Sequence, residues 1–130
     1  MTPQEIFNTV INHFYTQRKK SYSFDNNVCL YHGPNGLKCA IGCLIPDEIY
    51  IKEMDEDSWI IQKFSHRFKI LSYFTEGNNT DLLDKLQNIH DEASTSDDRV
   101  TFLLKDLSKE LNKVAKEFNL VLPEIAVKYL

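Results

Sequence analysis

The run Cys39–Ile45 constrains the fold of this chain more than any other segment, because none of its seven residues carries a charge. Such a stretch is stable in water only when other elements cover it, so it is expected in the core. It forms either a short helix, with Cys39 and Cys43 on one face, or an extended segment. Gly42 in its interior indicates that another stretch of backbone approaches closely.

The turn that precedes this run predicts a β-hairpin. In Gly33–Gly36, Pro occupies the second turn position and Gly the fourth, which favours a type I turn whose last glycine is left-handed. The flanking strands are expected at Val28–His32 and Leu37–Cys39. In this register Tyr31 faces Cys39 across the hairpin.

Capping and periodicity signals predict helices on both sides of the hairpin. The first helix has a capping box at its start and is expected to end near Arg18–Lys20. The expected N-caps are Thr2, then Asp57 or Ser58, then Thr80, and finally Ser96. The apolar stripes are Ile6, Val10 and Phe14; Ile60, Phe64 and Phe68; Leu82, Leu86 and Ile89; and Val100, Leu104, Leu107, Leu111, Val114 and Phe118. Asn119 is expected as a left-handed C-cap of the last of these helices.

These elements predict an α+β, mainly helical fold with an N-terminal helix, a short β-hairpin and then three or so helices in one compact domain, residues 1–130.

The composition excludes several classes of protein and partner. The chain is 42% hydrophobic and 26% charged, which argues against disorder. No stretch approaches the ~18 apolar residues of a membrane helix, so no membrane partner is expected. The net charge of −4 argues against a nucleic-acid partner. Three cysteines, an odd number, and a start without an apolar leader favour the cytoplasm with reduced thiols.

The cysteines admit three interpretations. Cys29 and His32, with Cys39 and Cys43, offer four ligands at spacings that a structural zinc ion uses. Free cysteines also behave as small core residues, and this interpretation is favoured over zinc. Alternatively, Cys39 is a nucleophile and His90 its base, because a helix N-terminus and a histidine together acidify and activate a thiol. His13 and His66 are alternative bases, because nothing in the spacing selects among the three histidines.

Several charged or aromatic residues are candidates for contacts with a ligand or partner. Lys63 and Arg67 share one face of an expected helix and could receive a phosphate or an acidic protein, although a solvated basic face of an amphipathic helix is the favoured interpretation. Tyr31 and Lys38 on the hairpin, and Asp91 beside His90, are further candidates.

Residues 29–50, CLYHGPNGLKCAIGCLIPDEIY, resemble a signature of short proteins encoded by phages and prophages. Residues 4–10 and 86–91 are similar to the same family, so the likeness covers roughly the first 90 residues. His32 departs from the family, which usually has Arg there, and this weakens the zinc interpretation. The resemblance implies an accessory protein of the bacterial host cytosol that binds a host protein or a small anionic signalling ligand, or counters a defence system. Binding is therefore predicted in preference to catalysis, with the cysteine enzyme and the zinc-stabilised module as alternatives.

The last expected helix also raises the question of assembly. Its apolar residues between Val100 and Phe118 alternate at spacings of four and three, as in a coiled-coil seam. This seam is expected to pack either on the first helix of the same chain or on a second copy in a homodimer. Lysines and glutamates flank it, which is typical of coiled coils.

Overall fold

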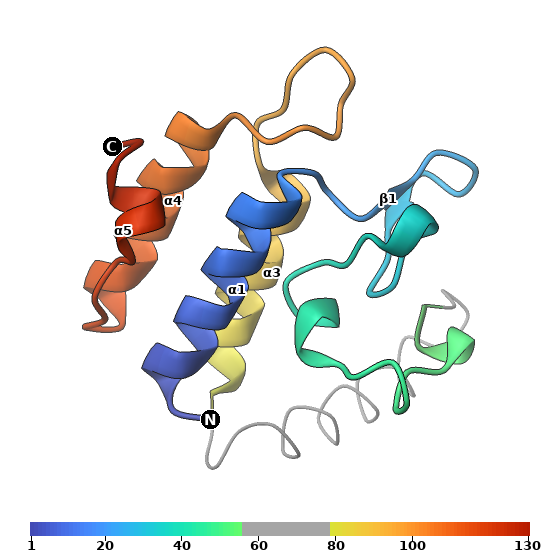
Figure 1. The fold of residues 1–130 in the computed structure, drawn as a ribbon, viewed down its shortest axis with the longest axis horizontal. Coiled ribbons are helices and arrows are strands. Elements are labelled where there is room, and N and C mark those ends of the chain that lie inside the picture. The colour runs from blue at the N-terminus through green and yellow to red at the C-terminus, as the bar shows by residue number, and fades with distance from the viewer. Residues whose placement is uncertain (56–78) are drawn as a thin grey trace.

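The computed structural model describes residues 1–55 and 79–130 (Figure 1). The helix expected from Asp57 or Ser58, with its candidate contact residues Lys63 and Arg67, lies outside the described residues. The described helices are α1 (Pro3–Gln17), α3 (Thr80–Glu92), α4 (Leu104–Glu117) and α5 (Glu124–Val127), with the short 3-10 helices η1 (Pro34–Gly36), η2 (Gly42–Leu44) and η3 (Lys52–Asp55). The strands are β1 (Tyr22–Ser23) and β2 (Val28–Cys29). The α+β, mainly helical class is confirmed.

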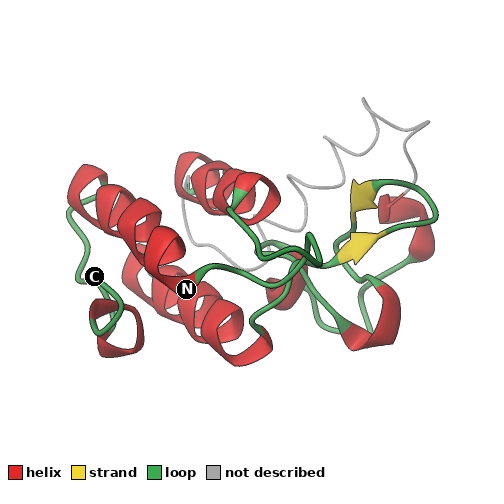
Figure 2. Ribbon diagram, turned by 90° about the horizontal axis from the view of Figure 1, so that it is seen from above, coloured by secondary structure: helices red, strands yellow, loops and turns green. Residues whose placement is uncertain are grey.

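The longer helices and the short elements occupy different parts of the molecule. In Figures 1 and 2, α4 and α5 lie on one side of α1, and the loop-rich segment 20–55 lies on the other. Helix α4 contacts α3 and α5, while α1 contacts α5 and η2. The hydrophobic core lies between these helices. Its largest fully buried side chains include Phe7 and Phe14 of α1, Leu83 and Leu86 of α3, and Leu111 of α4.

Helix α1 begins and ends where the sequence predicts. The Thr2 hydroxyl accepts a hydrogen bond from the Glu5 backbone N–H, and the Glu5 side chain bonds back to the Thr2 backbone, which completes the capping box. Arg18 adopts a left-handed conformation, with φ of 63°, and its N–H donates to the Phe14 carbonyl. The chain therefore leaves the helix immediately before the basic triplet.

The hairpin forms at a different place from the one expected. Tyr22 pairs with Cys29, and Ser23 with Val28, so the strand pair lies upstream of the predicted turn. The predicted hairpin is reduced to a single bridge between His32 and Lys38. The reason is that side chains from other elements take over the backbone groups that a longer ladder would have used, as described below.

The register of the predicted turn is nevertheless correct. The Gly33 N–H donates to the Leu37 carbonyl at 2.7 Å, and the Cys39 N–H donates to the Tyr31 carbonyl at 3.4 Å. The turn type differs, because Asn35 has φ of 60° where a type I turn needs a negative value. The last turn residue, Gly36, is left-handed as predicted.

The uncharged run is buried, as predicted. Cys39, Ala40, Ile41 and Ile45 are each at most 1% exposed, and the run contains η2 instead of an extended strand. A Cβ atom on Gly42 would lie 1.8 Å from the Tyr31 carbonyl oxygen, which confirms the close backbone approach. The run packs on α1, and the Gln87 side chain of α3 accepts a hydrogen bond from the Ile41 N–H.

Helix α4 begins later than predicted. The expected N-cap, Ser96, donates its hydroxyl proton to Asp98, whose carboxylate also accepts the backbone N–H groups of Val100 and Thr101. Residues 100–102 then pair with Arg18–Lys20: the Lys20 N–H donates to the Val100 carbonyl, and the Phe102 N–H donates to the Arg18 carbonyl. Because the backbone groups of residues 100–102 are extended and bonded to Arg18–Lys20, these residues cannot also form a helical turn, and α4 starts at Leu104.

The C-terminus of α4 follows the prediction. Asn119 is left-handed, with φ of 54°, and its N–H donates to the Lys116 carbonyl. The next N–H, of Leu120, donates to the Ala115 carbonyl at 2.7 Å, which is the paired bonding of a Schellman motif.

The apolar seam of α4 is covered within one chain. Leu107, Leu111 and Val114 are at most 4% exposed, and the helix packs mainly on α3 and α5. The expected α1 also contacts α4, through a buried hydrogen bond between the Tyr15 and Ser108 hydroxyls. Homodimerisation through these three side chains would require α3 and α5 to move away. In the described part of the chain, no helix combines the length and the hydrophobicity needed to cross a bilayer.

Candidate functional site

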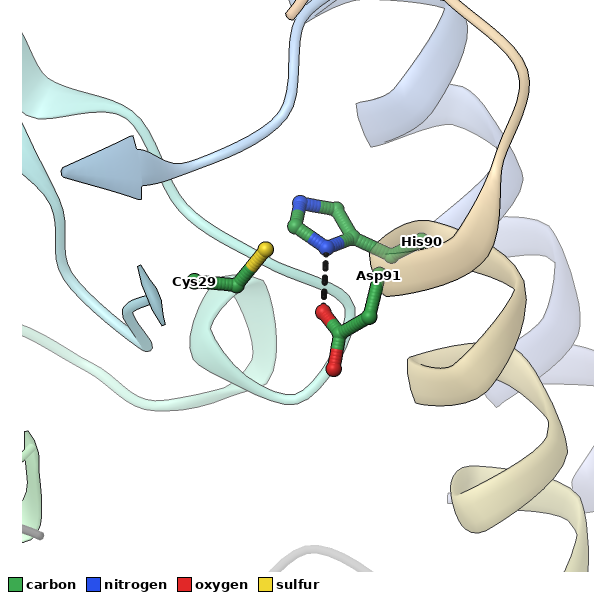
Figure 3. Close-up of side chains that lie close together, drawn as sticks. All are labelled: Cys29, His90 and Asp91. Atoms are coloured by element: carbon green, nitrogen blue, oxygen red, sulfur yellow. Dashed lines mark hydrogen bonds and ion pairs between the residues drawn. The ribbon is translucent and has the colours of Figure 1, made fainter. Parts of the chain in front are cut away.

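One cluster of chemically capable side chains forms where β2 meets the end of α3 (Figure 3). Cys29, His90 and Asp91 each direct a sulfur, nitrogen or oxygen atom to a common point, and these atoms lie within 4.8 Å of one another. His90 and Asp91 belong to the last turn of α3, and Cys29 comes from the hairpin. Among the described residues this is the one group of three or more such side chains.

His90 is fully buried, and both of its ring nitrogens have partners. Nδ1 lies 2.8 Å from the Asp91 carboxylate, and Nε2 lies 3.1 Å from the Ser21 backbone nitrogen. The Ser21 N–H donates, so Nε2 accepts and the ring proton resides on Nδ1, from which it bonds to Asp91. The ring also contacts Phe14 and Phe102, at centroid distances of 5.9 and 5.8 Å. His90 thereby ties α3 to the strand segment.

Asp91 lies at the boundary between this core and solvent, with its side chain 39% exposed. Its carboxylate also accepts a hydrogen bond from the Gln87 amide at 2.9 Å, and its backbone carbonyl accepts one from the Lys20 ammonium at 2.8 Å. The carboxylate is therefore held by two side chains of α3, and the adjacent backbone is held by the segment that leads into β1.

Cys29 completes the cluster as a thiol and not as a thiolate. Burial, followed by the neighbouring Asp91 carboxylate, raises the pKa of Cys29 to about 12. The Lys20 ammonium opposes this shift weakly. Since the thiolate is the nucleophilic form, the protonated Cys29 thiol is a poor nucleophile at neutral pH.

The hydrogen bonds of His90 also argue against a metal ion at this cluster. A metal on Nδ1 would displace the ring proton to Nε2, where it would face the Ser21 N–H. The observed arrangement instead satisfies both ring nitrogens without an ion. The cluster is best described as a buried hydrogen-bond network that joins the hairpin to α3.

The four-ligand zinc interpretation is wrong, because its side chains do not converge. The His32 ring donates toward the Gly42 and Ile45 carbonyls, at 3.1 and 3.2 Å, and stacks on Tyr50. Cys39 Sγ accepts from the Gly42 N–H, and Cys43 Sγ donates to the Ala40 carbonyl. His32, Cys39 and Cys43 are thus engaged with nearby backbone, and within the described ranges Cys29 clusters with His90 and Asp91 instead of with these three.

The proposed catalytic pair of Cys39 and His90 does not have the geometry of a nucleophile and its base. Cys39 is 1% exposed, and burial strongly raises the pKa of its thiol. Both nitrogens of His90 bond to other groups, as described above. His13, a second candidate base, directs its Nε2 to the Lys38 carbonyl at 2.7 Å. The third, His66, lies outside the described residues.

The candidate contact residues of the hairpin, Tyr31 and Lys38, have hydrogen-bond or ion-pair partners within the chain. The Tyr31 N–H donates to the Asp55 carboxylate at 2.7 Å, which fastens this part of the chain to η3. The Lys38 ammonium forms an ion pair with Asp47 at 3.0 Å, and its backbone is held by Gln17 and His13 of α1. The structure does not join these residues and Asp91 into one site.

A groove between α3 and α4 was not anticipated from the sequence. It has a volume of about 740 Å³. Its lining residues are Lys85, Asn88, Ile89, Glu92, Ala93, Ser94, Asp106, Leu107, Lys109, Glu110, Lys113, Val114 and Glu117. Three lysines and four acidic residues make it strongly polar. The charges on α4 are evident in the sequence, where they are typical of coiled-coil flanks. The position of α3 beside them depends on long-range packing, which local patterns do not predict.

Comparisons with known proteins identify no relative. The chain matches no protein-family model, and no curated protein or solved structure is significantly similar to it. The resemblance to phage and prophage proteins thus stays an expectation from the sequence.

Proposed function

We propose that this chain is a small binding protein of the bacterial cytosol, of the phage accessory type, and that it receives a host protein in the α3–α4 groove. The observation that carries the proposal is the groove itself, with its volume of about 740 Å³ and its charged walls. Both walls belong to regular helices, which hold their side chains in fixed positions without help from a ligand.

The composition of the groove favours a protein over a small molecule. Pockets for small ligands are mostly apolar, with few polar groups. Here charged side chains form much of the lining, and two ion pairs, Lys85 with Glu117 and Lys113 with Glu110, lie within it. Mixed charges of this kind are common at the rims of protein–protein interfaces, where they select the partner more than they raise affinity.

The chemistry of the Cys29 cluster supports the same conclusion. Its thiol is protonated at neutral pH, and its histidine has no free nitrogen with which to accept a proton from a substrate. These groups hold the fold together, which leaves the groove as the better candidate for function.

Site-specific photocross-linking tests the proposal. A photoreactive residue placed at Asn88, on the exposed wall of α3, is expected to capture a host protein from a bacterial lysate. The same group placed at Glu48, an exposed residue outside the groove, serves as the matched control. A product specific to Asn88 supports the proposal. Identical products from both positions, or none from Asn88, would contradict it.

A further inference from the structure

We infer that the partner presents an amphipathic α-helix with basic residues clustered at one end, and that these residues meet the end of the groove formed by Glu92 and Asp106. This inference rests on the proposed function and names the chemistry of its partner. We call this end the acidic end, and the end with Lys85 and Glu117 the paired end.

The two walls are antiparallel, which defines a long axis for the groove. Lys85, early in α3, lies 3.9 Å from Glu117, the last residue of α4. At the opposite end, Glu92 closes α3 and Asp106 lies in the first turn of α4. From Lys85 to Glu92 the α3 wall extends for about 10 Å at 1.5 Å per residue, which suits two turns of a docked helix.

A helix fits these walls better than an extended strand. A bound strand gains most of its affinity from backbone hydrogen bonds to a free sheet edge. The backbone groups of α3 and α4 are already bonded within their helices, so the groove offers side chains alone. Two neighbouring helices do present ridges and a groove that accept the side chains of a third helix.

The charges along the axis differ between the two ends. At the paired end, Lys85 and Glu117 neutralise each other, and in the middle Lys113 pairs with Glu110 at 2.9 Å. Glu92 and Asp106 are exposed, and among the described residues neither forms an ion pair within 4.0 Å. Lys109 is the one lysine of the lining that also forms none there, so two unpaired acids outweigh one unpaired base. Cations of a partner can therefore bind at the acidic end without breaking an existing ion pair.

The position of Glu92 strengthens this argument. It is the last residue of α3, where the carbonyl end of the helix disfavours a negative charge. The N-terminus of α4 stabilises the negative charge of Asp106, which adds a second carboxylate to the same end of the groove.

Half-buried Ile89 and Ala93 lie beside these acids and give an apolar strip for the apolar face of the partner helix. The net charge of −4 on the whole chain favours the same partner chemistry.

Titration of the full, isotope-labelled chain with two synthetic peptides tests the inference by NMR. Both are amphipathic helices with the same apolar stripe; one carries arginines at one end, and the other carries glutamates there. The arginine peptide is expected to shift amide signals of residues 85–94 and 106–117 and to bind at least about tenfold more tightly. Equal affinities, or shifts confined to other segments, would overturn the inference.

Charge-neutral variants locate the effect. Glu92→Gln with Asp106→Asn is expected to weaken binding of the arginine peptide about tenfold. The matched control, Asp25→Asn with Glu48→Gln, removes the same charge from exposed residues outside the groove and should leave binding within about twofold. An equal loss in both variants would overturn the inference. If cross-linking at Asn88 succeeds while the arginine peptide shows no preference, the proposed function stands and this inference alone fails.

Discussion

At the scale of single residues, His90 shows how one buried polar side chain can hold two distant segments. Its ring links the Ser21 backbone to Asp91 and packs against Phe14 and Phe102. The sequence showed His90 and Asp91 as neighbours on a helix, but nothing in it identified Ser21 as a partner. That contact depends on how the chain returns after α1, which local patterns do not encode.

His90→Ala is expected to lower the free energy of unfolding by about 2–4 kcal/mol, because it leaves a cavity and a buried Ser21 N–H without an acceptor. Asn88→Ala, an exposed change on the same helix, should stay within about 0.5 kcal/mol of the parent protein. Urea unfolding measures both. If His90→Ala lowers the free energy of unfolding no more than Asn88→Ala does, His90 does not stabilise the packing of α3 on the segment around Ser21.

Cys29 should react slowly with alkylating reagents. A pKa of about 12, compared with the ordinary 9.0, reduces the thiolate fraction at pH 8 by about 1,000-fold. Iodoacetamide labelling followed by mass spectrometry should modify Cys29 far more slowly than a thiol introduced by Glu48→Cys. Denaturant should remove the difference. Comparable rates in the folded protein would contradict the assigned environment.

His13 makes stability depend on pH. Burial lowers the pKa of His13 below its ordinary 6.5, so the folded state keeps the ring neutral while the unfolded chain takes up a proton. The contribution is present above pH 6.5 and is lost as the pH falls below it, by at most about 1.4 kcal/mol per pH unit. His13→Gln should therefore lose less unfolding free energy between about pH 7.5 and pH 5.5 than the parent protein. An unchanged pH dependence would exclude His13 as its source.

At the scale of elements, side chains of the helices replace the missing β-ladder. Segment 20–55 has only two strands of two residues each in its described structure, and the helices satisfy several of its backbone groups. Gln17 bonds to both the N–H and the carbonyl of Lys38, and Gln87 accepts the Ile41 N–H. The Asp55 carboxylate of η3 accepts hydrogen bonds from the Tyr31 N–H at 2.7 Å and from the His32 N–H at 3.3 Å. Such ties give this segment a defined shape without regular secondary structure.

Gly42→Ala is expected to destabilise the protein by about 3 kcal/mol, because the new methyl group would collide with the Tyr31 backbone. Gly36→Ala provides the comparison: Gly36 has open space around it, and its φ of 76° alone should cost about 1 kcal/mol. If chemical denaturation shows an equal loss of unfolding free energy in the two variants, the Tyr31 backbone can move away from the added methyl group, and the close approach at Gly42 does not constrain the fold.

Local signals predicted the elements unevenly. The capping box of α1 and the left-handed Asn119 depend on neighbouring residues, so the sequence was sufficient to place them. The late start of α4 depends on pairing between residues 100–102 and 18–20, which are far apart in the chain. The strand at Tyr22–Ser23 pairs with the nearby Val28–Cys29, whereas the turn signal at Gly33–Gly36 predicted the hairpin farther downstream. The apolar pattern of 100–118 predicted Val100 as the first seam residue of the helix, whereas in the structure the Val100 carbonyl accepts the Lys20 N–H and the helix starts at Leu104.

At the scale of the whole molecule, the fold class followed from the pattern of elements, whereas the candidate site did not. A seam of Leu107, Leu111 and Val114 predicts that α4 is buried, but it does not say which surface covers it. In the structure α3 and α5 cover it, and the same packing creates the groove. The groove is thus a product of tertiary arrangement, and its lining combines residues that no local sequence pattern connects.

Loss of the Asn88 cross-link on charge reversal is the most direct test of whether this groove is the binding site. Glu92→Lys with Asp106→Lys, in a chain that carries the photoreactive group at Asn88, should reduce the yield of the cross-linked host protein by at least about tenfold. Asp25→Lys with Glu48→Lys, which changes the net charge equally, should leave that yield nearly unchanged. A yield that is unaffected by the groove variant, or reduced equally by both, would contradict the account.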